Sequence, residues 1–226
     1  MDFILAFFLR IRSILTHPVL FFRDPPKNGG ISAPLGFALT VHWLGAALGY
    51  LWRTAFGSSM PSNWQVFVQN WANDTPIDHP ARQIPWQDVG SQMINWFFGL
   101  AAVIADPFLT LFALLTTSAL VFIGARLLVP AGENGALNEV SYSSALRVIC
   151  YSMAPSLFIG IPWIGTPLAW VYTTVITILG ARETYRVNTF QAILISLFPK
   201  LLFIGIIIGG LCLMLLFVFS FMITHW

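Results

Sequence analysis

The feature that most constrains this chain is a pair of apolar segments joined by a short corner. The segments are Val148–Ile161 and Leu168–Ala181, and the corner between them reads PWIGTP, without a charge. Arginine stands at the far end of both segments, at Arg147, Arg182 and Arg186. The corner is too short to hold a domain. The pattern therefore predicts two antiparallel membrane helices whose basic ends lie on the same side of the membrane.

Composition agrees with a membrane chain. Of the 226 residues, 57% are hydrophobic and only 9% are charged, whereas about a quarter of the residues of a soluble domain are charged. The formal net charge of +2 offers no basic face for nucleic acid. We expect an all-α integral membrane protein with no nucleic-acid partner.

Residues 1–30 are predicted to form a cytoplasmic interfacial helix and a hinge. Arg10 and Arg12 follow a short apolar run, which is the reverse of the charge order in a signal peptide. Apolar residues recur at helical spacing between these charges, as in helices that lie on a membrane surface. His17-Pro18 then breaks the helix, and a polar stretch rich in proline and glycine leads to Gly30.

Residues 31–226 are predicted to form a single membrane domain, a bundle of five transmembrane helices. Hydropathy alone leaves either one span after Asp106 or two spans flanking it, with Asp106 at a boundary in both cases because a carboxylate is costly at the bilayer centre. With one span, nine of the 11 basic residues fall on the cytoplasmic side, so the positive-inside rule favours it. The expected spans are about 31–52, 107–129, 148–161, 168–181 and 201–223.

This topology makes residues 53–106 an extracytoplasmic loop. Within it, Met93–Ala105 is predicted to be an extracytoplasmic helix that is either interfacial or re-entrant. The N-terminus is then cytoplasmic and the C-terminus extracytoplasmic.

Three residues within or beside the expected spans are candidates for a polar path. His42 and Asp106 are ionisable, and such residues in a membrane can mark a proton or ion path. A neutral imidazole bonded to a neighbouring helix would also explain His42. Pro155 could kink its helix and open a polar cavity, as broken helices do in transporters, or it could make a static bend.

Two pairs of glycines have the small-xxx-small spacing that lets helices approach closely. They are Gly45 with Gly49 in the first expected span and Gly205 with Gly209 in the last. Each pair is predicted to pack a helix within the bundle or to form the seam of a homo-oligomer.

The charged residues at the cytoplasmic helix ends form a candidate contact site. Arg182 and Arg186 are four residues apart, on one helix face, and Glu183 can pair with Arg186. These arginines either bind anionic lipid headgroups or dock a partner, because a guanidinium holds phosphate or carboxylate through two hydrogen bonds. The candidate residues are Arg126, Arg147, Arg182, Glu183 and Arg186.

The sequence contains no recognised catalytic or phosphate-binding motif. A glycine-rich phosphate loop, Gly-x-Ser-x-Gly, His-Glu-x-x-His and Cys-x-x-Cys are all missing. We therefore expect no enzyme, no cofactor and no metal site.

The order of parts resembles the Yip family of membrane proteins. The resemblance rests on the HPVLFFRDP lead-in, the five expected spans and three short motifs: YSMAP from Tyr151, IPWIG from Ile161 and GARETY from Gly180. It implies a membrane domain without catalytic residues to carry over. It also implies association with other membrane proteins, since eukaryotic members act with Rab-type GTPases in early secretory membranes. The short N-terminal lead is typical of bacterial members, which places Rab binding in doubt.

Two functions follow from the sequence. The first is a non-enzymatic scaffold of a bacterial inner membrane that organises membrane-protein partners or copies of itself through its helices and its arginines, in contact with membrane lipids. The alternative is a small transporter or a lipid-translocating protein.

Overall fold

The computed structural model describes residues 2–26, 30–56, 70, 100–129 and 140–224, and these ranges are helical without a strand. Three helical stretches are long and apolar enough to cross a membrane: Ser32–Trp52, Leu100–Leu128 and Thr189–Met214. The all-helical fold is therefore confirmed. In chain order the helices are α1 (Asp2–Thr16), α2 (Pro18–Arg23), α3 (Ser32–Phe56), α6 (Leu100–Leu128), α7 (Tyr142–Ser152), the 3₁₀ helix η3 (Ala154–Gly160), α8 (Gly165–Tyr185) and α9 (Thr189–Thr224).

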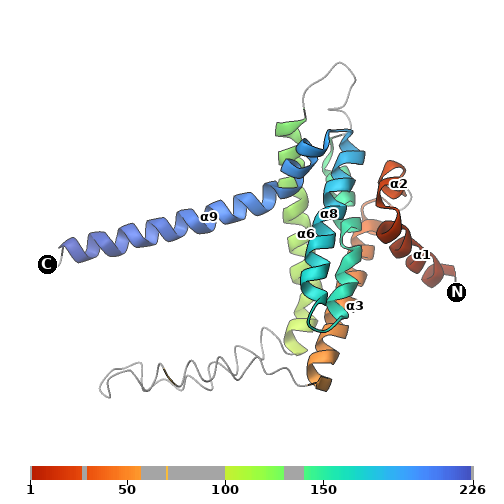
Figure 1. Ribbon diagram of the computed structural model, residues 1–226, viewed down its shortest axis with the longest axis horizontal. Coiled ribbons are helices and arrows are strands. Elements are labelled where there is room, and N and C mark those ends of the chain that lie inside the picture. Colours follow the sequence, from red (N-terminus) through yellow and green to blue (C-terminus); the bar gives the residue numbers. More distant parts are fainter. Residues whose placement is uncertain (1, 27–29, 57–69, 71–99, 130–139, 225–226) are drawn as a thin grey trace.

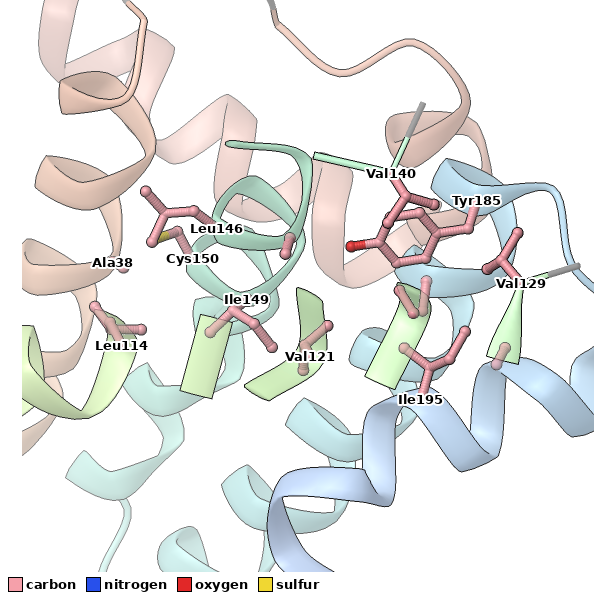
Figure 2. Packing of buried hydrophobic residues seen from close by; sticks show 14 residues of the cluster. Ala38, Leu114, Val121, Val129, Val140, Leu146, Ile149, Cys150, Tyr185 and Ile195 are labelled. Atoms are coloured by element: carbon pink, nitrogen blue, oxygen red, sulfur yellow. The ribbon is translucent and has the colours of Figure 1, made fainter. Parts of the chain in front are cut away.

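The helices α3, α6, α7 with η3, and α8 form a bundle that the first part of α9 joins (Figure 1). A buried cluster fixes which ends lie together. Val129 after α6, Val140 before α7, Tyr185 at the end of α8 and Ile195 of α9 belong to it, as Figure 2 shows. The end of α6, the start of α7, the end of α8 and the start of α9 therefore lie at one end of the bundle, which we call the basic end because Arg126, Arg147, Arg182 and Arg186 are all near it.

Two helices at the basic end begin with reciprocal side-chain caps. At α7, the Ser144 backbone N–H donates to Ser141 Oγ and the Ser141 N–H donates to Ser144 Oγ, both at 3.1 Å. At α9, the Gln191 N–H donates to Asn188 Oδ1 at 2.8 Å and the Asn188 N–H to Gln191 Oε1 at 3.3 Å. Each cap satisfies backbone donors that the first helical turn leaves without partners.

The predicted hairpin is present, but its first arm is not one α-helix. The sequence predicted a span at Val148–Ile161. The structure instead ends α7 at Ser152 and continues as the tighter helix η3. Pro155 explains the change because proline has no N–H for an α-helical hydrogen bond and its ring disfavours the preceding α turn. After a corner at residues 161–164, α8 returns antiparallel and packs against η3 and α7.

Close contact between α3 and η3 depends on glycine. A Cβ at Gly45 would overlap the Ser156 carbonyl oxygen and lie 3.0 Å from the carbonyl carbon, and a Cβ at Gly49 would lie 3.1 Å from the Ile159 oxygen. The first predicted small-residue pair therefore lies where α3 meets the backbone of η3. This is the close helix approach that such spacing permits.

Asp106 lies inside a helix, near its start at Leu100, and its predicted place at a membrane boundary stays a prediction. The helix α6 runs through Pro107 without interruption for 29 residues. Proline has no N–H, so the Val103 carbonyl four residues earlier has no α-helical donor. Trp43 of α3 supplies one, since its indole Nε1 donates to the Val103 oxygen at 3.1 Å. This hydrogen bond between α3 and α6 replaces the missing helical one, so α6 continues through Asp106 and Pro107.

The N-terminal segment packs on the bundle, and its predicted position at a membrane surface stays a prediction. The predicted break at His17-Pro18 is present between α1 and α2. Ile11 and Ile14 are buried with residues of α3, α7 and α8. The Tyr172 hydroxyl of α8 donates to the Leu15 carbonyl at 2.5 Å. The end of α1 is therefore attached to the membrane domain by both apolar and polar contacts.

The last helix leaves the bundle after Pro199, and its apolar part points away from the other helices (Figure 1). Residues 201–214 are exposed. A Cβ at Gly205 or Gly209 would meet no described atom within 4 Å. This glycine pair therefore contacts no other described helix, and its packing within the bundle or at a seam between copies of the chain stays a prediction.

Candidate functional site

A polar cavity of about 320 Å³ lies at the basic end, between the end of α2, the start of α7 and the end of α8. We call it the arginine pocket. Its described lining residues include three arginines and one carboxylate, together with several hydroxyl groups, and so carry an excess of positive charge. The polar residues that line it are Arg23, Ser141, Ser143, Ser144, Arg147, Glu183, Thr184 and Arg186.

Glu183 is held between two of the nearby guanidinium groups. Its Oε1 accepts from Arg182 Nη2 at 2.8 Å and from Nε at 3.1 Å, and its Oε2 lies 3.5 Å from Arg23 Nη2. The Glu183 side chain is 15% exposed, whereas that of Arg23 is 67% exposed. The first contact is a charge-assisted pair with good geometry, and the second is solvated and weak.

Arg147 lines the pocket and has a hydrogen-bond donor that the described residues do not use. Its Nε atom is buried and has no hydrogen-bond partner among them. A buried guanidinium N–H without an acceptor is unfavourable. An anionic group in the pocket would supply an acceptor.

Arg182 and Arg186 do not lie on one helix face, although the sequence predicted that they do. Arg182 and Arg186 were expected on one face of a continuing helix, but α8 ends at Tyr185 and Arg186 takes a left-handed conformation with φ 52° and ψ 39°. The backbone N–H groups of Arg186 and Val187 both donate to the Arg182 carbonyl. This arrangement closes the last turn of a helix. As a result Arg186 lines the pocket, while Arg182 pairs with Glu183 beside it.

The pocket gains one residue that the sequence did not indicate and lacks another that it did. Arg23 comes from α2, 160 positions before its partner Glu183, and no local spacing connects them. Arg126 is exposed at the end of α6, with its guanidinium 5.3 Å from the centre of the Phe122 ring, and it does not line the pocket.

His42 and Asp106 come together between α3 and α6. His42 Nε2 lies 3.3 Å from Asp106 Oδ1, and both side chains are 21% exposed. The other polar atoms of the pair, His42 Nδ1 and Asp106 Oδ2, are buried without a hydrogen-bond partner among the described residues. The two ionisable residues that the sequence singled out thus form one polar pair inside the bundle.

A second cavity, of about 400 Å³, lies between α6 and α8 and reaches His42. We call it the inner cavity. Its walls are mainly apolar, with hydroxyl groups from α6 and α8 and the ammonium group of Lys200 from α9. Pro155 is fully buried and does not line it, whereas Met153, at the break between α7 and η3, does.

The comparison with known proteins identifies a family. A model of the Yip1 domain matches residues 12–211, which is most of the chain and includes all residues of both cavities. No curated protein and no solved structure matches it. The matched region contains the packed bundle, the hairpin and the helix α9 as far as Leu211. The chain is therefore an integral membrane protein of the Yip1 domain family.

Proposed function

We propose that this protein is a non-enzymatic membrane organiser that docks an anionic group of a membrane-protein partner in the arginine pocket. The observation that supports this function is the convergence of Arg23, Arg147 and Arg186 on one cavity whose described lining residues include a single carboxylate. Guanidinium groups bind carboxylate and phosphate through two hydrogen bonds. Salt screens this attraction less at a partly buried site than at a fully exposed one.

The test is recovery of membrane-protein partners after gentle extraction of a tagged protein. Replacing Arg147 and Arg186 by glutamine removes two charges from the pocket and leaves the Arg182–Glu183 pair intact. We expect at least about tenfold lower recovery of a stoichiometric partner. Charged hydrogen bonds contribute about 1.5–3 kcal/mol each, and a tenfold change corresponds to about 1.4 kcal/mol.

Arg126→Gln is the matched control because Arg126 is an exposed arginine at the same end of the bundle, outside the pocket. It should leave recovery unchanged. Equal recovery with the double variant and with wild type would contradict the docking site. A second arm uses nanodiscs of neutral phosphatidylcholine, to which the purified partner is added. If wild type and the double variant recover the partner equally in these neutral nanodiscs, the pocket is assigned to anionic lipid.

We also propose five membrane crossings, with the N-terminus in the cytoplasm of a bacterial cell and the C-terminus outside. The helices α7 and η3 have 11 and 7 residues, which correspond to about 16 Å and about 14 Å. Together they match a hydrocarbon core of about 30 Å. With 21 residues, α8 has a similar length. The fifth crossing is the apolar part of α9, and the basic end faces the cytoplasm in accordance with the positive-inside rule.

Cysteine labelling tests this topology in a background of Cys150→Ala and Cys212→Ala, which removes both natural cysteines. Trp163→Cys lies in the corner of the hairpin, where the natural side chain is 95% exposed, and should react with an impermeant maleimide from outside. Phe190→Cys, at the basic end, should react only after permeabilisation. Labelling of both positions from the same side would contradict a hairpin that crosses the membrane.

A small transporter or lipid-translocating protein is a second candidate function, and the inner cavity favours it. The cavity places Lys200, His42 and several hydroxyls within helices that can span a membrane. Liposomes containing the purified protein should then move lipid between leaflets faster than protein-free liposomes. Equal rates would count against lipid translocation.

A further inference from the structure

Lys200 is the one lysine or arginine among the described residues that line the inner cavity, and it forms no ion pair with any described residue. Lys200 Nζ donates to the Thr174 hydroxyl at 2.6 Å and lies 4.5 Å from the centre of the Trp170 ring. Among the described residues it has no carboxylate within ion-pair distance. Both of its contacts leave the ammonium charge uncompensated, since a hydroxyl and a ring carry no net charge.

This half-buried charge lies away from the basic end of the bundle, beside the exposed Trp170 ring. Thr174 precedes Arg182 by eight residues on α8, which is about 12 Å along the helix axis at 1.5 Å per residue. An ionised lysine at that depth in a membrane protein normally pairs with an anion or reaches water. The ammonium is therefore placed to attract an anionic group that enters the cavity.

Hydroxyl groups near Lys200 add hydrogen-bonding capacity. Ser196 is one turn before Lys200 on α9, is only 6% exposed, and its Oγ has no partner among the described residues. Thr177 already donates to the Thr173 carbonyl at 2.7 Å. The Ser196 hydroxyl therefore has no hydrogen-bond partner among the described protein atoms. A buried hydroxyl in that state is unfavourable unless a ligand or a water molecule binds it.

Apart from His42 and the threonine hydroxyls, the rest of the cavity is apolar, and it opens at the surface of the bundle. Leu109 at its rim is 66% exposed, while Leu114 deeper in the wall is buried. Ile149 and Met153 of the hairpin's first arm complete the apolar wall. A volume of about 400 Å³ is at the lower end of the range of small-molecule sites, which is about 300–1,000 Å³.

We infer that the inner cavity binds a single-chain amphiphile with an anionic head, the head at Lys200 and Ser196 and the chain along the apolar wall of α6. The ammonium and the hydroxyl suit a carboxylate or a phosphate, and the open rim lets the remainder of the chain continue into the bilayer. This site is separate from the arginine pocket and needs no protein partner.

Photolabelling tests this binding site in the purified full-length protein. The probes are a long-chain fatty acid and a lysophosphatidic acid, each with a diazirine in its chain, and the labelled residues are mapped by mass spectrometry. Labelling should concentrate on residues 109–117 of α6 and 173–177 of α8. Lys200→Met should lower it at least about tenfold, Lys200→Arg should retain it, and Arg12→Met, which removes an exposed arginine far from the cavity lining, should not change it.

A comparator that needs no variant is a diazirine fatty alcohol with the same chain. Weak labelling by this neutral probe supports recognition of the anionic head, and labelling equal to that by the acid overturns it.

Inorganic phosphate alone should not compete with the labelled probes, because it lacks the apolar chain. Full displacement by phosphate would show a simple anion site and overturn the proposed amphiphile. Arg147→Gln with Arg186→Gln should leave the labelling unchanged, which distinguishes this site from the arginine pocket. Equal labelling of wild type and Lys200→Met would also overturn the inference.

Discussion

Alanine at position 45 is expected to lower the stability of the folded bundle by about 2–3 kcal/mol, within the range of overpacking substitutions. The added Cβ would overlap the backbone oxygen of Ser156 and lie 3.0 Å from its carbon. Backbone atoms of η3 have no alternative rotamer, so either α3 or η3 must move. The fraction unfolded is measured by circular dichroism as a function of sodium dodecyl sulfate in mixed micelles.

Gly36→Ala is the matched control on the same helix. A Cβ at Gly36 would meet nothing within 4 Å, so this substitution should show only the helix preference of alanine over glycine, a gain of up to about 1 kcal/mol. The two substitutions have identical chemistry and opposite expected signs. If Gly45→Ala were as stable as Gly36→Ala, η3 would be free to move away from α3, and the close contact would not be a determinant of the fold.

The features that a single sequence can indicate depend on local patterns. The arginines at the ends of the hairpin lie at one end of the bundle because helix length and corner length together determine which ends meet. The small-residue pair Gly45 and Gly49 contacts another segment because its spacing puts both glycines on one face of α3. Such patterns are complete within one or two neighbouring segments.

The features that the sequence did not indicate depend on partners far apart in the chain. Arg23 reaches Glu183 across 160 positions. The Trp43 indole satisfies a carbonyl that Pro107 leaves without its helical donor. Lys200 of α9 donates to the Thr174 hydroxyl of α8, 26 positions earlier in the chain. Each of these contacts requires the packing of helices in three dimensions, for which a single sequence gives no direct signal.

Replacing His42 by leucine is expected to cost about 2–3 kcal/mol of stability. It removes the group 3.3 Å from Asp106 Oδ1, and Oδ2 already has no partner among the described residues. The carboxylate would then remain inside the bundle unpaired. Loss of one member of a fully buried pair costs about 3–5 kcal/mol, and the 21% exposure of both side chains lowers the expected value. His17→Leu is the control, since His17 is exposed and lies outside the bundle core.

The double variant His42→Leu with Asp106→Leu should recover most of that loss, because it leaves no unpaired polar group and removes a carboxylate that is costly in a membrane. A double-mutant cycle in mixed micelles then gives a coupling free energy of at least about 1 kcal/mol, in the range found for residues in contact. Additive effects of the two single substitutions would show that the residues are neighbours without an energetic interaction. A clear coupling would mean that α3 and α6 are held together by this pair, so that any change in its hydrogen bonding is transmitted to the wall of the inner cavity that His42 lines.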